Sequence, residues 1–415
     1  MKWIRPSRIS GSLSAPPSKS MTIRGIAAAL LAKGESSLIN PSWCDDACAG
    51  ISVAEALGAQ IERESHRLLV TGGGPLRETS LDCHESGLCI RMFVPIAALR
   101  PERIVLTGTG SLISRPMGMA EAPLHQLGVE CQTNAGLALV VVRGPLRSGK
   151  ATIDGSVSSQ FLSGLLFALP LCDGDSELNV RSLKSRPYVS LTLAVMRQFG
   201  VSVAAEQGFE RIFVKGGQLY RPCSLQVEGD WSGAAFLFVA GALGGKVVVR
   251  NLQIQSLQAD KNILQALHST GARISKAEDS ISVMKDGLRA FAFDATECPD
   301  LFPALVALAC HCDGRSTISG LDRLRHKESD RAQALLSEFI KIGARISISG
   351  NHFEIEGGRL KGGFIDAHND HRIAMAGAVA ALNSNEGVVI SGWECVSKSY
   401  PGFFSDLEQI KGERA

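Results

Sequence analysis

Gly58-Ala59-Gln60-Ile61 is the first of five similar tetrapeptides that divide this 415-residue chain at nearly regular intervals. The other four are Gly128-Val129-Glu130-Cys131, Gly200-Val201-Ser202-Val203, Gly271-Ala272-Arg273-Ile274 and Gly343-Ala344-Arg345-Ile346. Glycine commonly follows a helix because it adopts the left-handed conformation without steric penalty, and the alternating residues after it suit a strand. With a sixth glycine, Gly412, near the end of the chain, the pattern predicts six copies of one unit.

The residues between the tetrapeptides predict the rest of the unit. Each tetrapeptide leads into a hairpin, such as residues 61–70 or 345–356. A short strand, a polar cluster and an apolar helix follow, with helices expected at residues 25–32 and 374–382. A second strand, such as 104–107 or 247–249, then precedes a helix that ends at the next tetrapeptide. The predicted unit is therefore strand, helix, strand, helix, hairpin, and the fold class is α/β.

Composition limits the class of protein. A chain of 415 residues is too long for one ordinary core, so six units indicate two domains of three. The net charge is +2 with basic residues spread along the chain, which argues against nucleic-acid binding. The apolar run at 234–243 is shorter than the roughly 20 residues that a membrane helix needs, and residues 1–6 lack the apolar core of a signal peptide. We expect a cytoplasmic protein with no membrane partner.

Cysteine and histidine residues do not predict a metal site. The eleven cysteines are scattered without a Cys-x-x-Cys pair, so neither a disulfide framework nor a zinc site is indicated. We interpret Cys310-His311-Cys312 as the buried end of an apolar helix. His368 and His371 have helical spacing but no third ligand nearby, so capping and anion contact are the preferred interpretation. We expect no metal and no organic cofactor.

Polar clusters precede the apolar helices of all six units. A helix start has about four backbone N–H groups without helical partners and a partial positive charge, so it attracts anions. For any single cluster, the preferred explanation of Ser, Asp or Asn is an N-cap, which contributes about 1 kcal/mol. Six clusters on repeated units could converge, however, and several carry cations that a cap does not need. The clusters begin at Pro16, His84, Gly155, Gly229, Cys298 and His368.

Cations within or near these clusters predict the ligand. Lys19 and Arg24 lie on nearly one face of the first apolar helix. Arg115-Pro116 and Arg186-Pro187 are expected to begin second helices, because proline is favoured in a first turn. Further cations occur at Lys327, Arg331, Arg372 and Lys398. Together they indicate a site for small molecules with several negative charges.

Four segments resemble signature motifs of the 5-enolpyruvylshikimate-3-phosphate synthase family. They are Pro17-Ser18-Lys19-Ser20, residues 155–161 (Gly-Ser-Val-Ser-Ser-Gln-Phe), residues 325–331 (Arg-His-Lys-Glu-Ser-Asp-Arg) and Asn369-Asp370-His371-Arg372. The resemblance implies two similar α/β domains, each of three βαβαββ repeat units around a pseudo-threefold axis, which is the enolpyruvyl transferase fold. It places one domain at 19–227 and the other at 1–18 with 228–415, with the active site in the cleft between them.

The same resemblance implies transfer of the enolpyruvyl group of phosphoenolpyruvate to the 5-hydroxyl of shikimate 3-phosphate, with release of phosphate. This is a step of the shikimate pathway to chorismate and the aromatic amino acids. The implied ligands of phosphoenolpyruvate are Lys19, Gly87, Arg115, Gln160, Arg331, Arg372 and Lys398. Those of shikimate 3-phosphate are Lys19, Ser20, Arg24, Ser158, Ser159, Gln160, Ser185, Tyr188, Asp300 and Lys327. Guanidinium groups suit a planar carboxylate because they donate two parallel hydrogen bonds.

The implied chemistry is addition followed by elimination, so protons must move to and from carbon and oxygen. Asp300 is the candidate base for the attacking hydroxyl, Glu328 exchanges a proton with the methylene carbon, and Lys19 assists the leaving phosphate. A monomer is the expected state. Glu85, Leu88 and Arg323 depart from the residues that are usual in the family at their positions.

Two alternatives remain. UDP-N-acetylglucosamine enolpyruvyl transferase shares the fold, but it typically has Lys-Asn where this chain has Lys19-Ser20. It also has a reactive cysteine in the loop that here spans residues 108–115, which contains no cysteine. A non-catalytic anion-binding protein would explain the cations and serines but not the acids Asp300 and Glu328, because their charge weakens anion binding. Phosphate release that depends on shikimate 3-phosphate separates the three.

Overall fold

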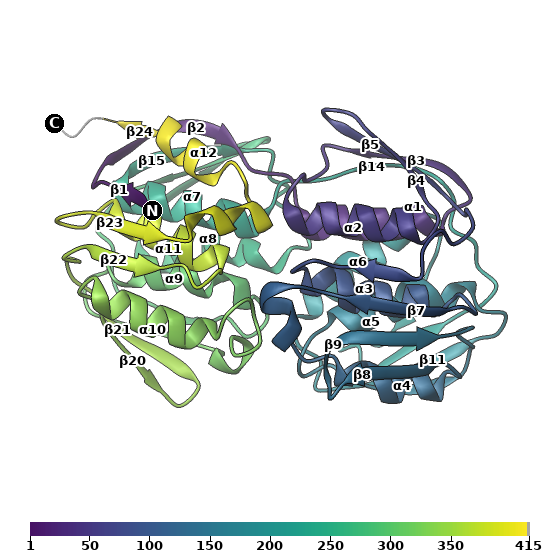
Figure 1. Cartoon of the computed structure of the whole chain (residues 1–415). Helices are drawn as coiled ribbons and strands as arrows, with labels where there is room; N and C mark the ends of the chain where they lie inside the picture. The colour runs from purple at the N-terminus through teal and green to yellow at the C-terminus, as the bar shows by residue number, and fades with distance from the viewer. Residues whose placement is uncertain (413–415) are drawn as a thin grey trace. The chain divides into compact units, whose positions relative to one another are not determined.

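The chain divides into two compact units, and the computed structural model describes residues 1–412 (Figure 1). The central unit spans Pro17–Val227, and the terminal unit contains the residues up to Pro16 and from Glu228 onward. We expected Ser18 in the terminal unit, whereas it lies in the central unit. Its hydroxyl caps the helix that begins at Lys19 by accepting the Met21 N–H at 3.3 Å, so Ser18 stays with that helix.

Three four-stranded sheets form the outer layers of the central unit, and each has the same strand order. They are β14 (Ser224–Gln226), β3 (Gly34–Ile39), β5 (Arg67–Gly72), β4 (Gln60–Arg63); β6 (Ser80–Asp82), β7 (Arg103–Thr107), β9 (Leu137–Arg143), β8 (Glu130–Asn134); and β10 (Lys150–Asp154), β11 (Ser176–Arg181), β13 (Arg211–Val214), β12 (Ala204–Ala205). In each sheet the first two strands are parallel and the other pairs are antiparallel.

The leading strand of the first sheet comes from the far end of the central unit. β14 pairs in parallel with β3, with Leu225 opposite Leu38. The first repeat is therefore completed only after the chain has passed through the other two.

The terminal unit has a similar arrangement, except that strands from the N-terminus of the chain join two of its sheets. Its sheets are β16 (Arg273–Lys276), β17 (Ser280–Met284), β15 (Gly245–Arg250), β2 (Arg8–Ser14), β24 (Lys411–Gly412); β18 (Ala292–Asp294), β19 (Arg315–Ser319), β21 (His352–Glu356), β20 (Arg345–Ser349); and β1 (Lys2–Ile4), β23 (Val388–Ser391), β22 (Gly363–Asp366). β2 pairs in parallel with β15, and β1 pairs antiparallel with β23. The N-terminal strands thus complete two repeats of the terminal unit.

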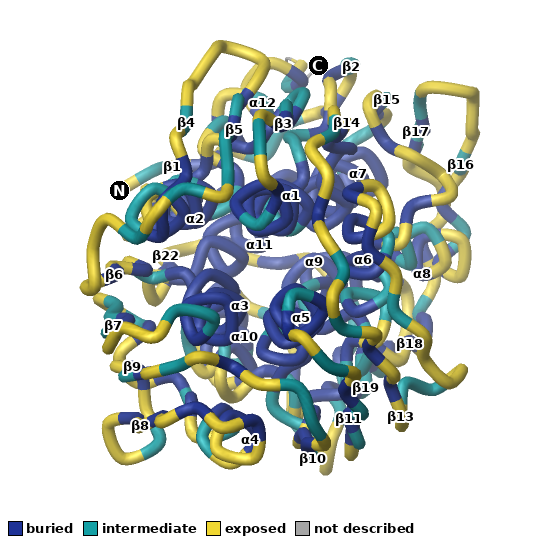
Figure 2. Tube along the Cα trace, turned by 90° about the vertical axis from the view of Figure 1, so that its right-hand side faces the viewer, coloured by how far each residue is buried: buried dark blue, intermediate teal, exposed yellow. Residues whose placement is uncertain are grey.

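The first helix of every repeat is buried almost throughout. These helices are α1 (Lys19–Leu31), α3 (Gly87–Ala97) and α5 (Gln160–Ala168) in the central unit, and α7 (Trp231–Gly244), α9 (Phe302–Ala309) and α11 (His371–Ala381) in the terminal unit. Figure 2 shows α1, α3 and α5 mostly in the colour of buried residues. In the terminal unit, α7, α9 and α11 pack against one another in pairs, so the core of the unit lies between its sheets.

The second helices are α2 (Asp45–Ala56), α4 (Glu121–Gln126), α6 (Arg186–Gln198), α8 (Ile263–Thr270), α10 (Arg331–Lys341) and α12 (Phe403–Gln409). α10 has polar and exposed residues on one face and buried residues such as Leu335 and Phe339 on the other, as expected for a helix that covers a sheet. The predicted order of strand, helix, strand, helix and hairpin is confirmed for the repeats that begin at β6, β10 and β18.

The tetrapeptide glycines have the predicted backbone conformation at five of the six positions. Gly58, Gly128, Gly200, Gly271 and Gly343 have φ between 79° and 115°. Gly412 differs from the other five, because it lies in β24 opposite Arg8, three residues after the end of α12 at Gln409.

Polar side chains cap four of the six buried helices directly. Ser18, Ser86, Asp230 and Asp370 accept backbone N–H groups at the starts of α1, α3, α7 and α11. Arg115-Pro116 does not begin a helix, contrary to our expectation. The 3-10 helix η1 (Gly110–Ser114) precedes this pair, and α4 begins only at Glu121. Within residues 1–412, no helix has the length and apolar character needed to cross a membrane.

Candidate active site

All predicted site residues of the central unit except Arg115 lie at or near helix starts. Lys19, Ser20 and Arg24 come from the first turns of α1, while Gly87 opens α3. The remaining predicted residues of this unit are Arg115 after η1, Ser158, Ser159 and Gln160 at the start of α5, and Ser185 and Tyr188 at the start of α6.

Arg24 is a buried cation held by three hydrogen bonds. Its Nε donates to Thr192 Oγ1 at 2.8 Å, its Nη1 to the Ser20 carbonyl at 3.0 Å and its Nη2 to the Tyr188 carbonyl at 3.2 Å. The side chain belongs to a residue that is only 1% exposed, and burial lowers the pKa of Arg24 to about 10. These contacts join Ser20, Arg24 and Tyr188, which were predicted together, into one rigid group.

Lys19 has a carboxylate partner that the sequence did not reveal. Its Nζ donates to Asp46 Oδ2 at 2.8 Å, and Asp46 lies in the first turn of α2. Both side chains are largely buried, so the Asp46 carboxylate fixes the position of the ammonium group.

Gly87 and Arg115 lie in close contact. A Cβ atom added at Gly87 would lie 2.3 Å from Arg115 Nη1, so only glycine leaves room for this guanidinium. Glu85 stabilises the preceding loop, because its Oε2 accepts the N–H and Oγ of Ser111 at 2.9 and 3.0 Å. The unusual Glu85 therefore holds the chain just before Arg115.

Gln160 is oriented by an arginine that we did not predict. Arg91, in the middle of α3, donates from Nη1 to Gln160 Oε1 at 3.0 Å and from Nη2 to the Pro116 carbonyl at 3.1 Å. It is only 4% exposed. A sequence signal existed, since Arg91 is the only charged residue in the apolar segment 87–97.

Besides Ser20, three predicted serines are buried beside helix starts. Ser158 Oγ accepts the Gln160 N–H at 3.1 Å, whereas Ser159 caps α5 without a side-chain bond. Ser185 precedes α6 with φ of 56°, a conformation that costs energy for a residue with a side chain. Hydroxyls and helical N–H groups in this arrangement can donate to a phosphate.

Asp300 is the centre of the cluster in the terminal unit. It lies in the 3-10 helix η5 (Pro299–Leu301) before α9. Its Oδ1 accepts Lys327 Nζ at 3.2 Å and Arg331 Nη1 at 2.9 Å, and its Oδ2 accepts Arg372 Nη2 at 3.2 Å. Burial would raise the pKa of Asp300, but Arg372, Lys327 and Arg331 together hold it well below its usual range.

Arg331 is completely buried among three carboxylates. Its Nε and Nη2 donate to the two oxygens of Asp370 at 2.9 and 3.2 Å, and Nη2 also donates to Glu328 Oε2. Burial favours the neutral form, yet Asp370, Glu328 and Asp300 raise the pKa of Arg331, so it stays charged. Asp370, which was not a predicted ligand, also caps α11 and accepts Ser329 Oγ at 3.0 Å.

The other cations of this cluster differ in their surroundings. Burial lowers the pKa of Lys327 to about 8, although Asp300 opposes the shift. The pKa of Arg372 is raised instead, because the attraction of Asp300 opposes the effect of burial. Arg323 also faces Asp300, and burial lowers its pKa. Lys398 donates to the Asn369 carbonyl at 2.7 Å, which places it beside the start of α11.

The described residues offer no metal centre of His, Cys, Asp and Glu ligands. His368 Nε2 lies 2.8 Å from Glu338 Oε1, so the anion that it contacts in this structure is a carboxylate of the protein itself. Cys310 and Cys312 are buried at the end of α9, and His311 contacts the Ala380 carbonyl at 3.1 Å.

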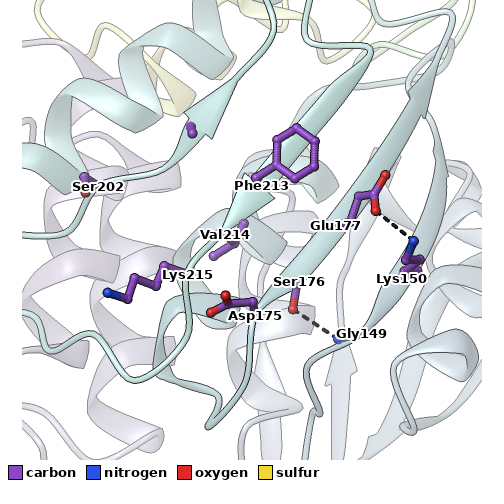
Figure 3. Close-up of a pocket in the computed structure, with 10 residues that line it drawn as sticks. Gly149, Lys150, Asp175, Ser176, Glu177, Ser202, Phe213, Val214 and Lys215 are labelled. Atoms are coloured by element: carbon purple, nitrogen blue, oxygen red, sulfur yellow. Dashed lines mark hydrogen bonds and ion pairs between the residues drawn. The ribbon is translucent and has the colours of Figure 1, made fainter.

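One open cavity of the central unit lies apart from the predicted residues. It has a volume of about 610 Å³ and lies over β10, β11 and β13, where Lys150 Nζ contacts Glu177 Oε2 at 3.0 Å (Figure 3). Its lining mixes acids with lysines, so it lacks the positive charge of the two clusters described above.

Comparison with known proteins decides the family. Residues 4–407 match the family model described as EPSP synthase (3-phosphoshikimate 1-carboxyvinyltransferase). The chain belongs to the EPSP synthase family. Similar relatives named 3-phosphoshikimate 1-carboxyvinyltransferase come from Clostridium perfringens and Clostridium kluyveri. They are 38% and 37% identical, with 99% of this chain and 98% and 97% of those proteins covered.

Solved structures agree with this family. An EPSP synthase from Acinetobacter baumannii matches with a TM-score of 0.81 at 25% identity, over 99% of this chain and 98% of that one. A second structure of EPSP synthase from the same organism gives a TM-score of 0.79. The predicted family and the predicted enolpyruvyl transferase fold are therefore confirmed.

Proposed function

We infer that this chain is a 3-phosphoshikimate 1-carboxyvinyltransferase. It transfers the enolpyruvyl group of phosphoenolpyruvate to the 5-hydroxyl of shikimate 3-phosphate and releases phosphate. Family membership over residues 4–407 makes it a transferase of the shikimate pathway. The observation that carries the mechanism is Asp300, an acid bonded to Lys327, Arg331 and Arg372. The cations can bind the two anionic substrates. The acid between them can act as the base that the reaction needs.

We assign the central-unit cluster mainly to shikimate 3-phosphate. Ser158, Ser159 and Ser185 would donate to its phosphate, together with Lys327 of the terminal unit. Arg24 and Ser20 would bind its carboxylate, and Tyr188, Gln160 and Asp300 its ring and hydroxyls. The rigid bonding of Arg24 supports this assignment, because a preorganised cation loses little entropy on binding.

Phosphoenolpyruvate would be held at both ends. Arg331 and Arg372 bind its carboxylate, while Lys19, Arg115, Lys398, Gln160 and the backbone of Gly87 bind its phosphate. Since Arg331 already contacts three carboxylates, we expect the substrate to take the place of Glu328 or Asp300 there. Because these ligands come from both units, we place the active site between them in one monomer.

The reaction begins when the 5-hydroxyl oxygen attacks C2 of phosphoenolpyruvate. Glu328, which takes up a proton from solvent once the substrate carboxylate has replaced it at Arg331, gives this proton to C3 while the hydroxyl proton passes to Asp300, and a tetrahedral intermediate with a methyl group forms. Glu328 then removes a methyl proton, the bond between C2 and the phosphate oxygen breaks, and Lys19 stabilises the leaving phosphate. Exchange with solvent returns the proton on Asp300.

The surroundings of Asp300 suggest how its basicity is controlled. Three cations lower its pKa, so its carboxylate is a weak base while those cations face it alone. Each substrate anion that binds Lys327, Arg331 or Arg372 offsets part of their charge. The pKa of Asp300 therefore rises when both substrates are bound, and the base becomes strong where it is needed.

The test is phosphate release from phosphoenolpyruvate by the purified protein with and without shikimate 3-phosphate. We expect release only with both compounds, accompanied by an equal amount of the enolpyruvyl ether. Release with UDP-N-acetylglucosamine instead would identify the other enolpyruvyl transferase. Binding without release would identify a non-catalytic protein.

A further inference from the structure

Glu338 is a buried acid that has no role in the reaction described above. It lies on α10, the helix that Arg331 opens, and is only 1% exposed. Its Oε1 contacts Lys341 Nζ at 2.7 Å and His368 Nε2 at 2.8 Å, while its Oε2 accepts the Asp366 N–H at 2.9 Å. Burial would raise the pKa of Glu338, but these three hydrogen bonds lower it below its usual value, so the group is ionised at neutral pH. An ionised carboxylate only accepts hydrogen bonds, so His368 Nε2 is the donor.

Two partners of Glu338 lie at the turn that joins β22 to α11. Asp366 ends β22, and its Oδ1 accepts the N–H of His368 in the turn. His368 and Asn369 have φ of 51° and 54°, a left-handed conformation that costs energy for residues with side chains. Two such residues in succession persist where neighbouring groups hold them. The bond from His368 to Glu338 therefore holds the turn from the side of α10.

The turn also carries the acceptor of Lys398. This lysine ends the 3-10 helix η7 (Trp393–Lys398), is 6% exposed and donates from Nζ to the Asn369 carbonyl at 2.7 Å. The direction of a carbonyl group is fixed by the backbone dihedrals on either side of its rigid peptide. The position of the ammonium group therefore depends on the turn. A continuous set of contacts connects Glu338 to a cation that we assign to the phosphate of phosphoenolpyruvate.

We propose that His368, held by Glu338, is a positioning residue that fixes Lys398 through the Asn369 carbonyl for binding of the phosphoenolpyruvate phosphate. Neither His368 nor Glu338 touches the substrate in this arrangement. The inference rests on the proposed function, because it needs Lys398 as a ligand of that phosphate. Loss of the His368 contact should weaken binding of phosphoenolpyruvate and not of shikimate 3-phosphate, to which Lys398 is not assigned.

The first experiment removes the contact and keeps the backbone. His368→Asn suits this purpose, because Asn adopts the left-handed conformation more readily than most residues and is too short to reach Glu338. At saturating shikimate 3-phosphate, KM for phosphoenolpyruvate should rise about tenfold, the effect of weakening one hydrogen bond to a charged group, while kcat changes little. His368→Gln places an amide nitrogen near the position of Nε2 and should restore most of the affinity. A wild-type KM in His368→Asn would overturn the inference.

Lys341→Gln is the matched control. Lys341 contacts the same carboxylate, but its side chain is half exposed and belongs to α10 rather than to the turn. This variant loses an ion pair and keeps the His368 bond, so its KM should equal that of the wild type. Equal increases of KM in Lys341→Gln and His368→Asn would show that the contact with the turn is not what matters, and would contradict the inference.

Glu338→Ala tests the same contact from its other end and should raise KM at least as much as His368→Asn. Its control is Glu408→Ala, which breaks a comparable ion pair on α12, where Glu408 Oε1 lies 2.6 Å from Lys411 Nζ. If Glu338→Ala does not fold, the His368 side chain, which is 40% exposed, still provides the test.

A double-mutant cycle decides whether His368 acts through Lys398. Lys398→Met removes the ammonium group and should itself raise KM for phosphoenolpyruvate. In that background His368→Asn should cause no further rise, because the group that it positions is gone. Increases that multiply would mean that His368 acts elsewhere, and an unchanged KM in Lys398→Met would remove this cation from the substrate; either result overturns the inference. Failure of the wild type to release phosphate with both substrates would instead defeat the proposed function.

Discussion

The carboxylate of Asp300 accepts hydrogen bonds from three cations on two segments of the chain. Lys327 precedes α10, Arg331 opens α10, and Arg372 lies in the first turn of α11. These contacts give Asp300 two functions that can be separated. It spaces the three cations, and it serves as the proposed base. A neutral side chain of equal size preserves much of the first function and removes the second.

Asp300→Asn should therefore lower kcat at least about a hundredfold, the usual scale for general acid–base catalysis. Binding of shikimate 3-phosphate, measured by tryptophan fluorescence or calorimetry, should remain within a few-fold of the wild type, because the cations stay in place. Asp313→Asn is the matched control, since this exposed acid lies beyond the other end of α9. Near-normal turnover in Asp300→Asn would remove Asp300 as the base.

Single residues show how far sequence alone could define the site. Asp300, Glu328, Arg331 and Arg372 were predicted and are brought together by the fold. Arg91 and Asp46 were missed because each acts through a partner distant in sequence, Gln160 in one case and Lys19 in the other. No local pattern predicts the contact of Asp46, whereas Arg91 could have been noticed as the charged residue of the apolar segment 87–97.

At the scale of elements, the repeats differ most at the starts of their buried helices. α1 begins with Lys19, α3 with Gly87 and α11 with His371 and Arg372, although all three are capped by Ser or Asp. The cap stabilises each helix in the same way, while the next residues differ. Gly87 is the clearest case, because its lack of a side chain lets Arg115 approach the helix start.

Gly87→Ala should leave the protein folded and raise KM for phosphoenolpyruvate. The added methyl group would overlap the guanidinium of Arg115 and lie in ordinary contact with Arg91 Nη1 at 3.5 Å, so we expect the Arg115 side chain to move rather than the backbone. Loss of one hydrogen bond to a charged group costs about 1.5–3 kcal/mol, which corresponds to a rise of about 10- to 100-fold. Steady-state kinetics with varied phosphoenolpyruvate measures it.

Gly287→Ala is the control for this substitution, because no atom lies within 4 Å of the added methyl group. A KM equal to that of the wild type in Gly87→Ala would show that Arg115 does not bind this substrate.

Element boundaries were predictable where glycine or a hairpin marked them. Arg345 to Glu356 forms the expected hairpin, and five glycines follow helices as predicted. Two departures from this pattern have the same cause. Arg115-Pro116 and Gly412 are of residue types that are typical at the end or start of a helix. Tertiary pairing decides their conformation instead, because Pro116 bridges to Leu137 and Gly412 pairs with Arg8.

At the scale of the whole molecule, the order of the repeats in the chain matters. β2 belongs to the terminal unit although it precedes the central unit in the chain, so the chain passes between the two units twice. The two units are therefore joined by two segments of chain, near residues 16–17 and 227–228. Closure around paired anions would bring the cations of both units to the same substrates and exclude water, which strengthens their attraction.

Shikimate 3-phosphate should therefore compact the protein. Small-angle X-ray scattering should show a smaller radius of gyration with saturating shikimate 3-phosphate, and inorganic phosphate at the same concentration should have less effect. An unchanged radius would contradict closure by this substrate.

The origin of the oxygen atoms in the released phosphate tests enolpyruvyl transfer by this protein directly. If the enolpyruvyl group is transferred by addition and elimination, the bond between C2 and oxygen breaks, and phosphate keeps the bridging oxygen of phosphoenolpyruvate. Turnover in water enriched in oxygen-18, followed by mass spectrometry of the phosphate, should then show no label, and release should require shikimate 3-phosphate. One labelled oxygen per phosphate would mean hydrolysis at phosphorus and would contradict the account.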